Sequence, residues 1–363
     1  DFKRDYSGYL NRRRDHLYLF DLASRKLEQL TKGDFDDAGP RWSRDGTQIV
    51  FASKRAPGSD RNDNTDLYVV AATVGAEPKA LTTFEGNDGG RGRAAFSPDG
   101  KWIAFLRGGD PKYWAYNNSR VAIVPVGGGE ARVLTERLDR PVSDLEWTSD
   151  GSGIYILFDD DRSVPLGRVN VATGAVDLVT KGPRGHSGIS VVGAKVAVTT
   201  STDLEPAEIA AVENGVYRRL SHHNDSLMAS LELASAVRID SKSKDGTSVG
   251  SMLYLPPGYR AGQRYPLALH IHGGPFGQDG HDFDLMRQVL AARGFAVLAV
   301  NYRGSSGGGE AFSRAIFADW GNKEVVDLLG AVDEAIAKGY ADPDRLGLLL
   351  GERASATVVR TGA

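Results

Sequence analysis

The sequence predicts two structural units in one chain: a set of β-propeller blades followed by an α/β domain with a doubly wound sheet. Up to about residue 235, short strands and turns repeat with a period near 50 residues. Such a period with several strands per unit is typical of propeller blades. From about residue 236, buried strands alternate with helices, which is typical of a parallel sheet covered by helices. We therefore assign residues 1–235 to the blades and residues 236–363 to the α/β domain.

The clearest repeat in the first unit is an aromatic residue followed by Asp-Gly and an apolar strand. Its copies begin at Trp42, Phe96 and Trp147, with spacings of 54 residues (42 to 96) and 51 residues (96 to 147). Asp-Gly favours a tight hairpin turn because glycine adopts positive φ. The aromatic side chain is expected to fill the space between neighbouring blades, since one blade cannot bury both faces alone.

Further strand pairs complete these units. They lie at residues 17–31, 67–82, 121–135 and 167–180, and a last, degenerate unit surrounds residues 191–194. About four blades result, at the low end for a closed propeller. Because the chain also begins at Asp1 rather than Met, we expect these to be the C-terminal blades of a larger propeller.

The second unit reads as alternating strands and helices. Strands are predicted at residues 251–259, 266–272, 295–300 and 345–350, and helices at residues 285–293 and 324–338. The run at 266–272 is almost continuously apolar, as in a parallel strand that is buried on both faces. The second helix is expected to bury the face formed by Val325, Leu329, Val332 and Ile336. Gly339 would cap this helix, and Pro343 prevents its continuation.

Composition excludes several classes of site. The 363 residues carry a net charge of −3 and no cysteine. Disulfides, thiolate metal sites and a cysteine nucleophile are therefore excluded, and non-specific nucleic-acid binding is disfavoured. No apolar stretch reaches the roughly 18 residues that a membrane helix needs. We expect a cytoplasmic protein, with a signal peptide before Asp1 left open.

One segment carries the chemistry of a candidate site. His270-Ile271-His272-Gly273-Gly274-Pro275 ends the predicted buried strand at 266–272. Glycines at the end of a strand allow backbone N–H groups to point at a developing oxyanion. The alternative is an ordinary tight turn after a strand.

Three further motifs favour the chemical interpretation. They are Asn301-Tyr302-Arg303-Gly304-Ser305-Ser306-Gly307, Phe317-Ala318-Asp319-Trp320-Gly321 and Asp342-Pro343-Asp344-Arg345-Leu346-Gly347. In this order and behind propeller repeats, they resemble the prolyl oligopeptidase family of serine peptidases, closest to its acylaminoacyl-peptidase and dipeptidyl-peptidase-like branch. The resemblance covers nearly the whole chain. It implies a propeller in front of an α/β-hydrolase domain that cleaves short peptides through an acyl-enzyme, without a cofactor or metal.

The resemblance also implies roles for single residues. The backbone N–H of Gly274 would be one oxyanion donor, and His272 and Gly273 would shape the strand end. His272 is not the triad histidine, which in this family lies much later in the chain. Arg303 and Trp320 are expected to be architectural.

The nucleophile segment departs from the family pattern. The family places Gly-x-Ser-Tyr-Gly-Gly after the next strand, whereas this chain reads Gly351-Glu352-Arg353-Ala354-Ser355-Ala356-Thr357. Ser355 has no glycine two places before or after it, and Arg353 and Thr357 would obstruct the sharp turn. We expect the triad Ser, Asp and His to be absent and the chain, truncated at both ends, to be inactive alone. A frameshift near residues 347–352 would explain this tail.

Other functions stay open at this point. A non-catalytic propeller that binds peptides or proteins, and an esterase of the same fold, are the alternatives. A metal site built from His270, His272, Asp279, His281 and Asp282 is disfavoured because their spacing matches no known ligand pattern. The expected partners are short peptides, with a homo-oligomer as a further option and neither nucleic acid nor membrane.

Overall fold

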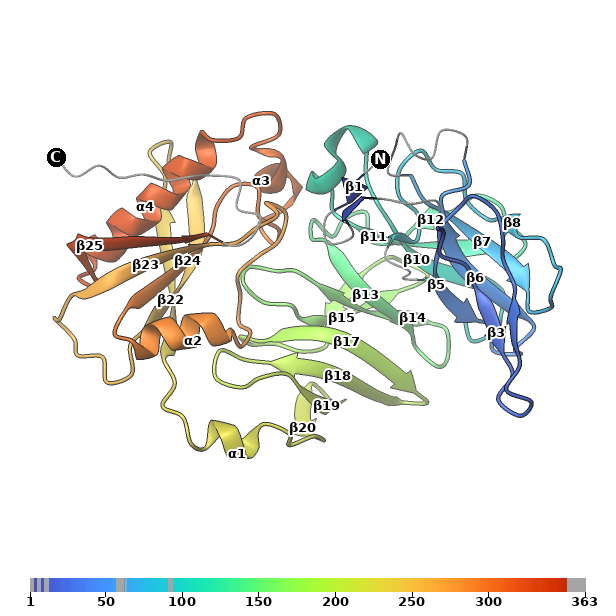
Figure 1. Ribbon diagram of the computed structural model, residues 1–363, viewed down its shortest axis with the longest axis horizontal. Helices are drawn as coiled ribbons and strands as arrows, with labels where there is room; N and C mark the ends of the chain where they lie inside the picture. The colour runs from blue at the N-terminus through green and yellow to red at the C-terminus, as the bar shows by residue number, and fades with distance from the viewer. Residues whose placement is uncertain are drawn as a thin grey trace.

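The computed structural model describes residues 13–56, 62, 64–90 and 94–350, and the backbone of two short strands, β1 (Lys3–Arg4) and β2 (Gly8–Tyr9). The side chains of Trp114 and Leu350 lie outside the description. Figure 1 shows antiparallel sheets from the N-terminal half on one side and a helix-covered sheet from the C-terminal half on the other.

The N-terminal half consists of small antiparallel sheets, each built from strands that are consecutive in the chain. Within the described residues, a two-stranded sheet is followed by four four-stranded sheets. The two-stranded sheet pairs β3 (Tyr18–Phe20) with β4 (Leu27–Gln29). The four-stranded sheets are β5 (Asp37–Trp42), β6 (Gln48–Ser53), β7 (Asp66–Ala71) and β8 (Lys79–Ala80); β9 (Ala94–Phe96), β10 (Trp102–Arg107), β11 (Arg120–Pro125) and β12 (Arg132–Val133); β13 (Val142–Trp147), β14 (Gly153–Phe158), β15 (Leu166–Asn170) and β16 (Val176–Leu178); and β17 (Gly185–Val192), β18 (Lys195–Ser201), β19 (Glu208–Glu213) and β20 (Val216–Arg219). This meander order is that of propeller blades. The number of blades in a complete propeller stays a prediction.

The repeated Asp-Gly turns behave as predicted, but the aromatic residues only in part. The Asp-Gly glycines all have φ near +70°, at Gly46, Gly100 and Gly151. Trp147 is buried, and its indole N–H donates to the Ala95 carbonyl of the preceding sheet. Trp42 is instead 56% exposed. Among the described residues, only the two-stranded sheets β1–β2 and β3–β4 precede the sheet of Trp42, and neither is a full blade against which its ring could pack.

The C-terminal half contains one five-stranded sheet. Its strands are β21 (Ser235–Lys242), β22 (Ser248–Leu255), β23 (Tyr265–Ile271), β24 (Ala296–Asn301) and β25 (Ala341–Leu350). Their spatial order is β21-β22-β24-β23-β25. The pairs that include β21 or β22 are antiparallel, whereas β23 is parallel to both β24 and β25. The predicted strands of this half are confirmed within a few residues.

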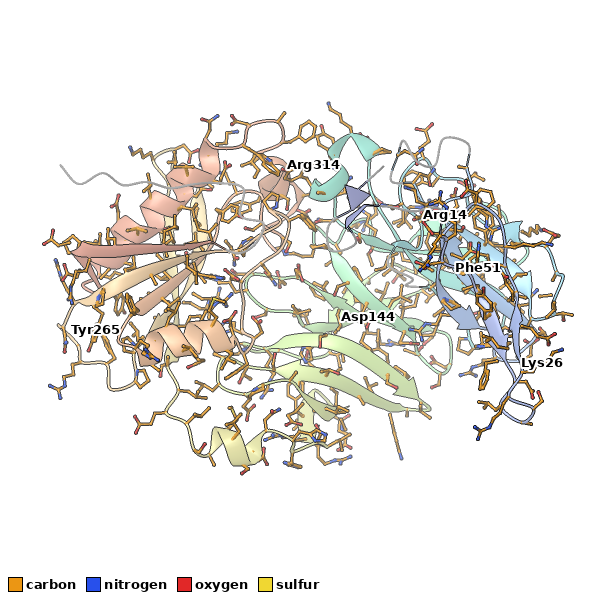
Figure 2. The ribbon with its side chains drawn as sticks, viewed as in Figure 1. Arg14, Lys26, Phe51, Asp144, Tyr265 and Arg314 are labelled. Atoms are coloured by element: carbon orange, nitrogen blue, oxygen red, sulfur yellow. The ribbon has the colours of Figure 1, made fainter. Side chains whose placement is uncertain are left out.

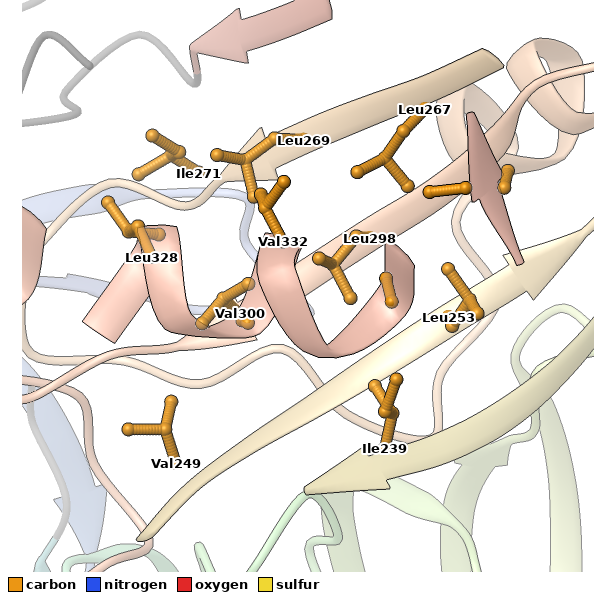
Figure 3. Packing of buried hydrophobic residues seen from close by; sticks show 14 of the residues in the cluster. Ile239, Val249, Leu253, Leu267, Leu269, Ile271, Leu298, Val300, Leu328 and Val332 are labelled. Atoms are coloured by element: carbon orange, nitrogen blue, oxygen red, sulfur yellow. The ribbon is translucent and has the colours of Figure 1, made fainter. Parts of the chain in front are cut away.

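Helices cover both faces of this sheet. On one face, α2 (Leu285–Ala292) packs on β22 and β24 through Ala291, Met252 and Val297. On the other face, α4 (Lys323–Ala337) covers a larger core with Leu328 and Val332 (Figure 3). Two short helices are α1 (Asp225–Met228) and α3 (Glu310–Arg314). None of the helices among the described residues is long and apolar enough to cross a membrane.

The buried face of α4 differs from the predicted one. Val325, Leu329 and Ile336 are only partly buried, whereas Glu324 and Asp327 are fully buried. The prediction assumed that charged residues face solvent. Here both acids have partners inside the protein, since Glu324 accepts from the Gly321 N–H at 2.5 Å and Asp327 binds the buried Arg303.

The two halves touch at a second point away from the connecting segment around α1 (Figure 1). A 3-10 helix, Pro111–Tyr116, packs against α3. Its Tyr113 ring lies edge-on to Phe317 at 5.1 Å and under the Arg314 guanidinium at 4.1 Å. Figure 2 shows Arg314 at this junction. Trp320 donates to the Tyr116 hydroxyl, which supports its predicted architectural role.

Candidate active site

The predicted site lies where the order of the parallel strands reverses. The chain passes from β23 to β24 on one side and later returns as β25 on the other side of β23. In open α/β sheets, ligands bind beyond the carboxyl ends of the strands at such a switch point. His272, Gly273 and Gly274 follow the carboxyl end of β23 directly. Ile271 pairs with Leu350, so the carboxyl end of β25 lies beside that of β23.

His272 is held on both sides of its ring. Its Nδ1 lies 2.9 Å from the Gly273 carbonyl, and its Nε2 lies 3.0 Å from Ser305 Oγ. A carbonyl only accepts, so Nδ1 donates to Gly273, and Nε2 shares a hydrogen bond with the Ser305 hydroxyl. The Tyr302 ring stacks on His272 at 4.7 Å, and its hydroxyl donates to the His272 carbonyl at 2.8 Å. Ser305 is fully buried, so this Ser–His contact fixes two loops rather than forming an accessible nucleophile.

Gly274 occupies a position that only glycine suits. Its φ is +137°, and a Cβ atom there would lie 2.7 Å from the Phe276 backbone nitrogen. The Gly274–Pro275 peptide bond is cis. Among the described residues, no hydrogen bond uses the Gly274 N–H. The structure thus leaves this donor available at the switch point, as an oxyanion donor requires.

The loop that follows β24 is anchored by a buried ion pair. Arg303 donates to Asp327 through its guanidinium at 2.7 Å and through its backbone N–H at 2.8 Å. Asp327 also accepts from the Ser243 hydroxyl, and Asp245 binds the same guanidinium at 2.5 Å. The predicted architectural role of Arg303 agrees with this arrangement. It ties the loop to α4 and to the turn between β21 and β22.

A second buried charge lies behind the loop that follows β23. Asp279 binds the Arg287 guanidinium and lies 3.6 Å from His270 Nδ1. Its backbone is held by Asn301, whose side-chain amide donates to the Asp279 carbonyl and accepts from its N–H. Burial alone would raise the pKa of Asp279, but Arg287 and His270 lower it to about 2. The residues considered for a metal site contact different partners: His270 faces Asp279, His272 binds Ser305, and His281 binds Asp203. Within the described residues, no three potential metal ligands form a group.

Acid should weaken this part of the fold. The pKa of Asp279 is below its ordinary value of 3.8, so its stabilisation is present above about pH 4 and is lost as the pH falls toward 2. The shift corresponds to about 2 kcal/mol. Urea unfolding at pH 5, 4, 3 and 2.5 should give a steeper loss of stability for the wild type than for Asp279→Asn. Equal slopes would contradict the assignment.

The nucleophile predictions cannot be placed in the same way. Ser355 and the segment Gly351–Thr357, with the proposed frameshift, lie outside the described residues. Sequence reasoning missed two contacts, that of Ser305 with His272 and that of Asp327 with Arg303. The motif at 301–307 contains Ser305 but does not indicate which side chain it contacts, and Asp327 belongs to no motif.

The open mixed sheet, covered by helices on both faces and followed by a glycine-rich loop at its switch point, has the arrangement of the α/β-hydrolase fold. Comparison with known proteins narrows the class. The model of the prolyl oligopeptidase family matches residues 281–349. Dipeptidyl-peptidase 5 of Porphyromonas gingivalis is 27% identical over 84% of this chain and 45% of that protein. The uncharacterized peptidase YuxL of Bacillus subtilis is 30% identical over 96% of this chain and 55% of that protein.

Solved structures show the same fold. The acylaminoacyl peptidase of Pyrococcus horikoshii has a TM-score of 0.75 at 23% identity and covers 92% of this chain, which spans 50% of that one. An acylaminoacyl peptidase in complex with Z-Gly-Gly-Phe-chloromethyl ketone has a TM-score of 0.71, with 86% and 47% covered. The chain belongs to the prolyl oligopeptidase family of serine peptidases. It spans about half the length of the curated relatives it matches.

Proposed function

We propose that this chain is part of an enzyme that hydrolyses short peptides through an acyl-enzyme, in the manner of acylaminoacyl or dipeptidyl peptidases. The observation that carries the proposal is the Gly274 N–H, which has no partner among the described residues and lies at the switch point beside the end of β25. A donor in that position can stabilise the oxyanion of a tetrahedral intermediate. The nucleophile would come from the segment after β25.

The position of the blade sheets favours short peptides as substrates. They contact the α/β half through the 3-10 helix on α3 and through hydrogen bonds to the loops after β23 and β24. A cavity of about 400 Å³ lies between the halves, bordered by His186 on one side and Gln278 on the other. A substrate that reaches the site past these contacts is expected to be a short peptide rather than a folded protein. We keep residues 1–235 and 236–363 as the proposed domain boundaries.

We also propose that these 363 residues do not turn over peptides by themselves. In a catalytically competent chain, the segment after β25 would have to form a tight elbow. Instead it carries Glu352 and Arg353, without the flanking glycines of the family pattern.

Two chromogenic anilides separate the outcomes: an N-acylated aminoacyl anilide and a dipeptide anilide with a free N-terminus. The given chain is expected to hydrolyse neither. A version in which the segment after β25 reads Gly-x-Ser-Tyr-Gly-Gly and continues into a complete hydrolase should hydrolyse one of them and react with a fluorophosphonate. Turnover by the given chain would contradict the inactivity, and failure of the repaired protein on all three reagents would contradict the peptidase assignment.

A further inference from the structure

The turn between β14 and β15 in the third four-stranded sheet has an unusual backbone. Asp160 and Ser163 exchange two backbone hydrogen bonds at 2.9 and 3.0 Å. The residues between them, Asp161 and Arg162, have φ of 41° and 71°. Positive φ at both central positions defines a type I′ turn, which normally takes Asn-Gly. An arginine in this conformation is uncommon, and such outliers often mark a functional requirement.

The Arg162 side chain anchors this hairpin tip, residues 159–163, in the α/β half. It is only 3% exposed. Its guanidinium binds Asp240 at 2.7 Å and donates to the Ser251 carbonyl at 3.1 Å. Arg238 binds the neighbouring Asp161. The tip is therefore fixed at β21 and β22.

The backbone of the tip holds the loop that follows β23. The Arg162 N–H donates to Gln278 Oε1 at 3.0 Å, and Gln278 Nε2 donates to the Ser163 carbonyl at 2.8 Å. The His281 N–H donates to the Arg162 carbonyl at 2.7 Å. Gln278 is four residues beyond Gly274, so the tip holds one end of the candidate oxyanion loop.

The tip also holds the loop that follows β24. Ser306 Oγ donates to Asp159 at 2.5 Å, and the Asp161 N–H donates to the Gly307 carbonyl at 3.3 Å. The Ser306 N–H in turn donates to the Gly277 carbonyl at 2.8 Å, which joins the two loops. Ser306 follows Ser305, the partner of His272. One hairpin from the blade half thus reaches both loops of the switch point.

The hairpin tip packs closely against Gly280, which has no side chain. A Cβ atom at Gly280 would lie 2.4 Å from the Arg162 carbonyl oxygen, although the backbone of Gly280 suits any residue. Cavities of about 400 and 210 Å³, both lined in part by Arg162 and Gln278, adjoin the contact. The tip is therefore a narrow contact with open space beside it, and a single methyl group can displace it.

We infer that the hairpin tip, residues 159–163, is a positioning element for the oxyanion loop at Gly273 and Gly274. When it is seated, it orders residues 273–278 through Gln278 and Ser306. When the blade half withdraws, these bonds break and the loop relaxes. The blade half thereby sets the competence of the site as well as access to it. The catalytic part of this inference rests on the proposed function, whereas the ordering of the loop does not.

Two variants test the inference by amide hydrogen exchange. Gly280→Ala pushes the tip away sterically, and Arg162→Gly removes the anchoring guanidinium while it keeps a residue that suits positive φ. Each should speed exchange of the amides at 272–279 by about tenfold or more, with the amides of α4 unchanged. Gly127→Ala, in the blade half, is the matched control, because a Cβ atom there would have nothing within 4 Å. It should leave the exchange rates unchanged.

The inference is wrong if neither variant speeds exchange in residues 272–279, or if exchange rises equally throughout both halves. In a form of the protein that hydrolyses peptides, Gly280→Ala should also lower kcat by about tenfold and change KM less than twofold, because the loop acts on the transition state. An equal fall in both parameters or no fall would contradict the positioning role. If the repaired and complete protein had no turnover, the proposed function would be contradicted, and the exchange experiment alone would decide this inference.

Discussion

Asp327→Ala is expected to lower the free energy of unfolding of the α/β half by about 3–5 kcal/mol. Asp327 is completely buried and satisfies the Arg303 guanidinium, the Arg303 backbone N–H and the Ser243 hydroxyl. Removing the carboxylate leaves a cation that is only 7% exposed with Asp245 as its remaining acidic partner. Urea unfolding followed by circular dichroism, together with hydrogen exchange in α4, measures the loss.

A matched control lies on the same helix. Glu334 and Lys338 form an exposed ion pair at 3.3 Å, and Glu334→Ala should change stability by about 0.5 kcal/mol or less. The double variant Asp327→Leu with Arg303→Met should recover most of the loss, because it removes both charges. A loss below about 1 kcal/mol for Asp327→Ala would mean that water replaces the carboxylate, contrary to the burial seen here.

The elements with a strong local pattern could be predicted from the sequence. The continuous apolar run before His272 is β23, buried on both faces as a central strand, and the Asp-Gly turns at Gly46, Gly100 and Gly151 have the expected positive φ. These features depend on residues that are close in sequence. The glycine-rich loop after β23 was predicted for the same reason.

Features that depend on distant partners could not be predicted. The buried face of α4 contains Asp327 because Arg303 and Ser243 meet it, 24 and 84 residues away. Periodicity assigns an acid to the solvent side unless its partner is known. The contact of the tip at Arg162 with Gln278 spans 116 residues and has no sequence motif. Ser305 lies within the motif at 301–307, but its structural role appears only through its bond to His272.

Gly274→Ala is expected to reduce kcat by about 100-fold or more in a form of the protein that hydrolyses peptides. The loss of one oxyanion donor lowers kcat by about 10²–10³. Alanine would have to adopt φ of +137° with its Cβ atom 2.7 Å from the Phe276 nitrogen, so the loop must move and carry the N–H away from the oxyanion position. Steady-state kinetics on a chromogenic peptide measures the effect.

Gly294→Ala separates this effect from backbone strain in general. Gly294 has φ of +89° and open space around it. It lies between α2 and the amino end of β24, whereas the switch point lies at the carboxyl ends of the parallel strands. Alanine there bears a similar left-handed strain of about 1 kcal/mol or more, so it should lower the unfolding free energy and leave kcat unchanged. If Gly294→Ala reduced kcat as strongly as Gly274→Ala, the loss would come from destabilisation. If Gly274→Ala kept wild-type kcat, the Gly274 N–H would not be the oxyanion donor.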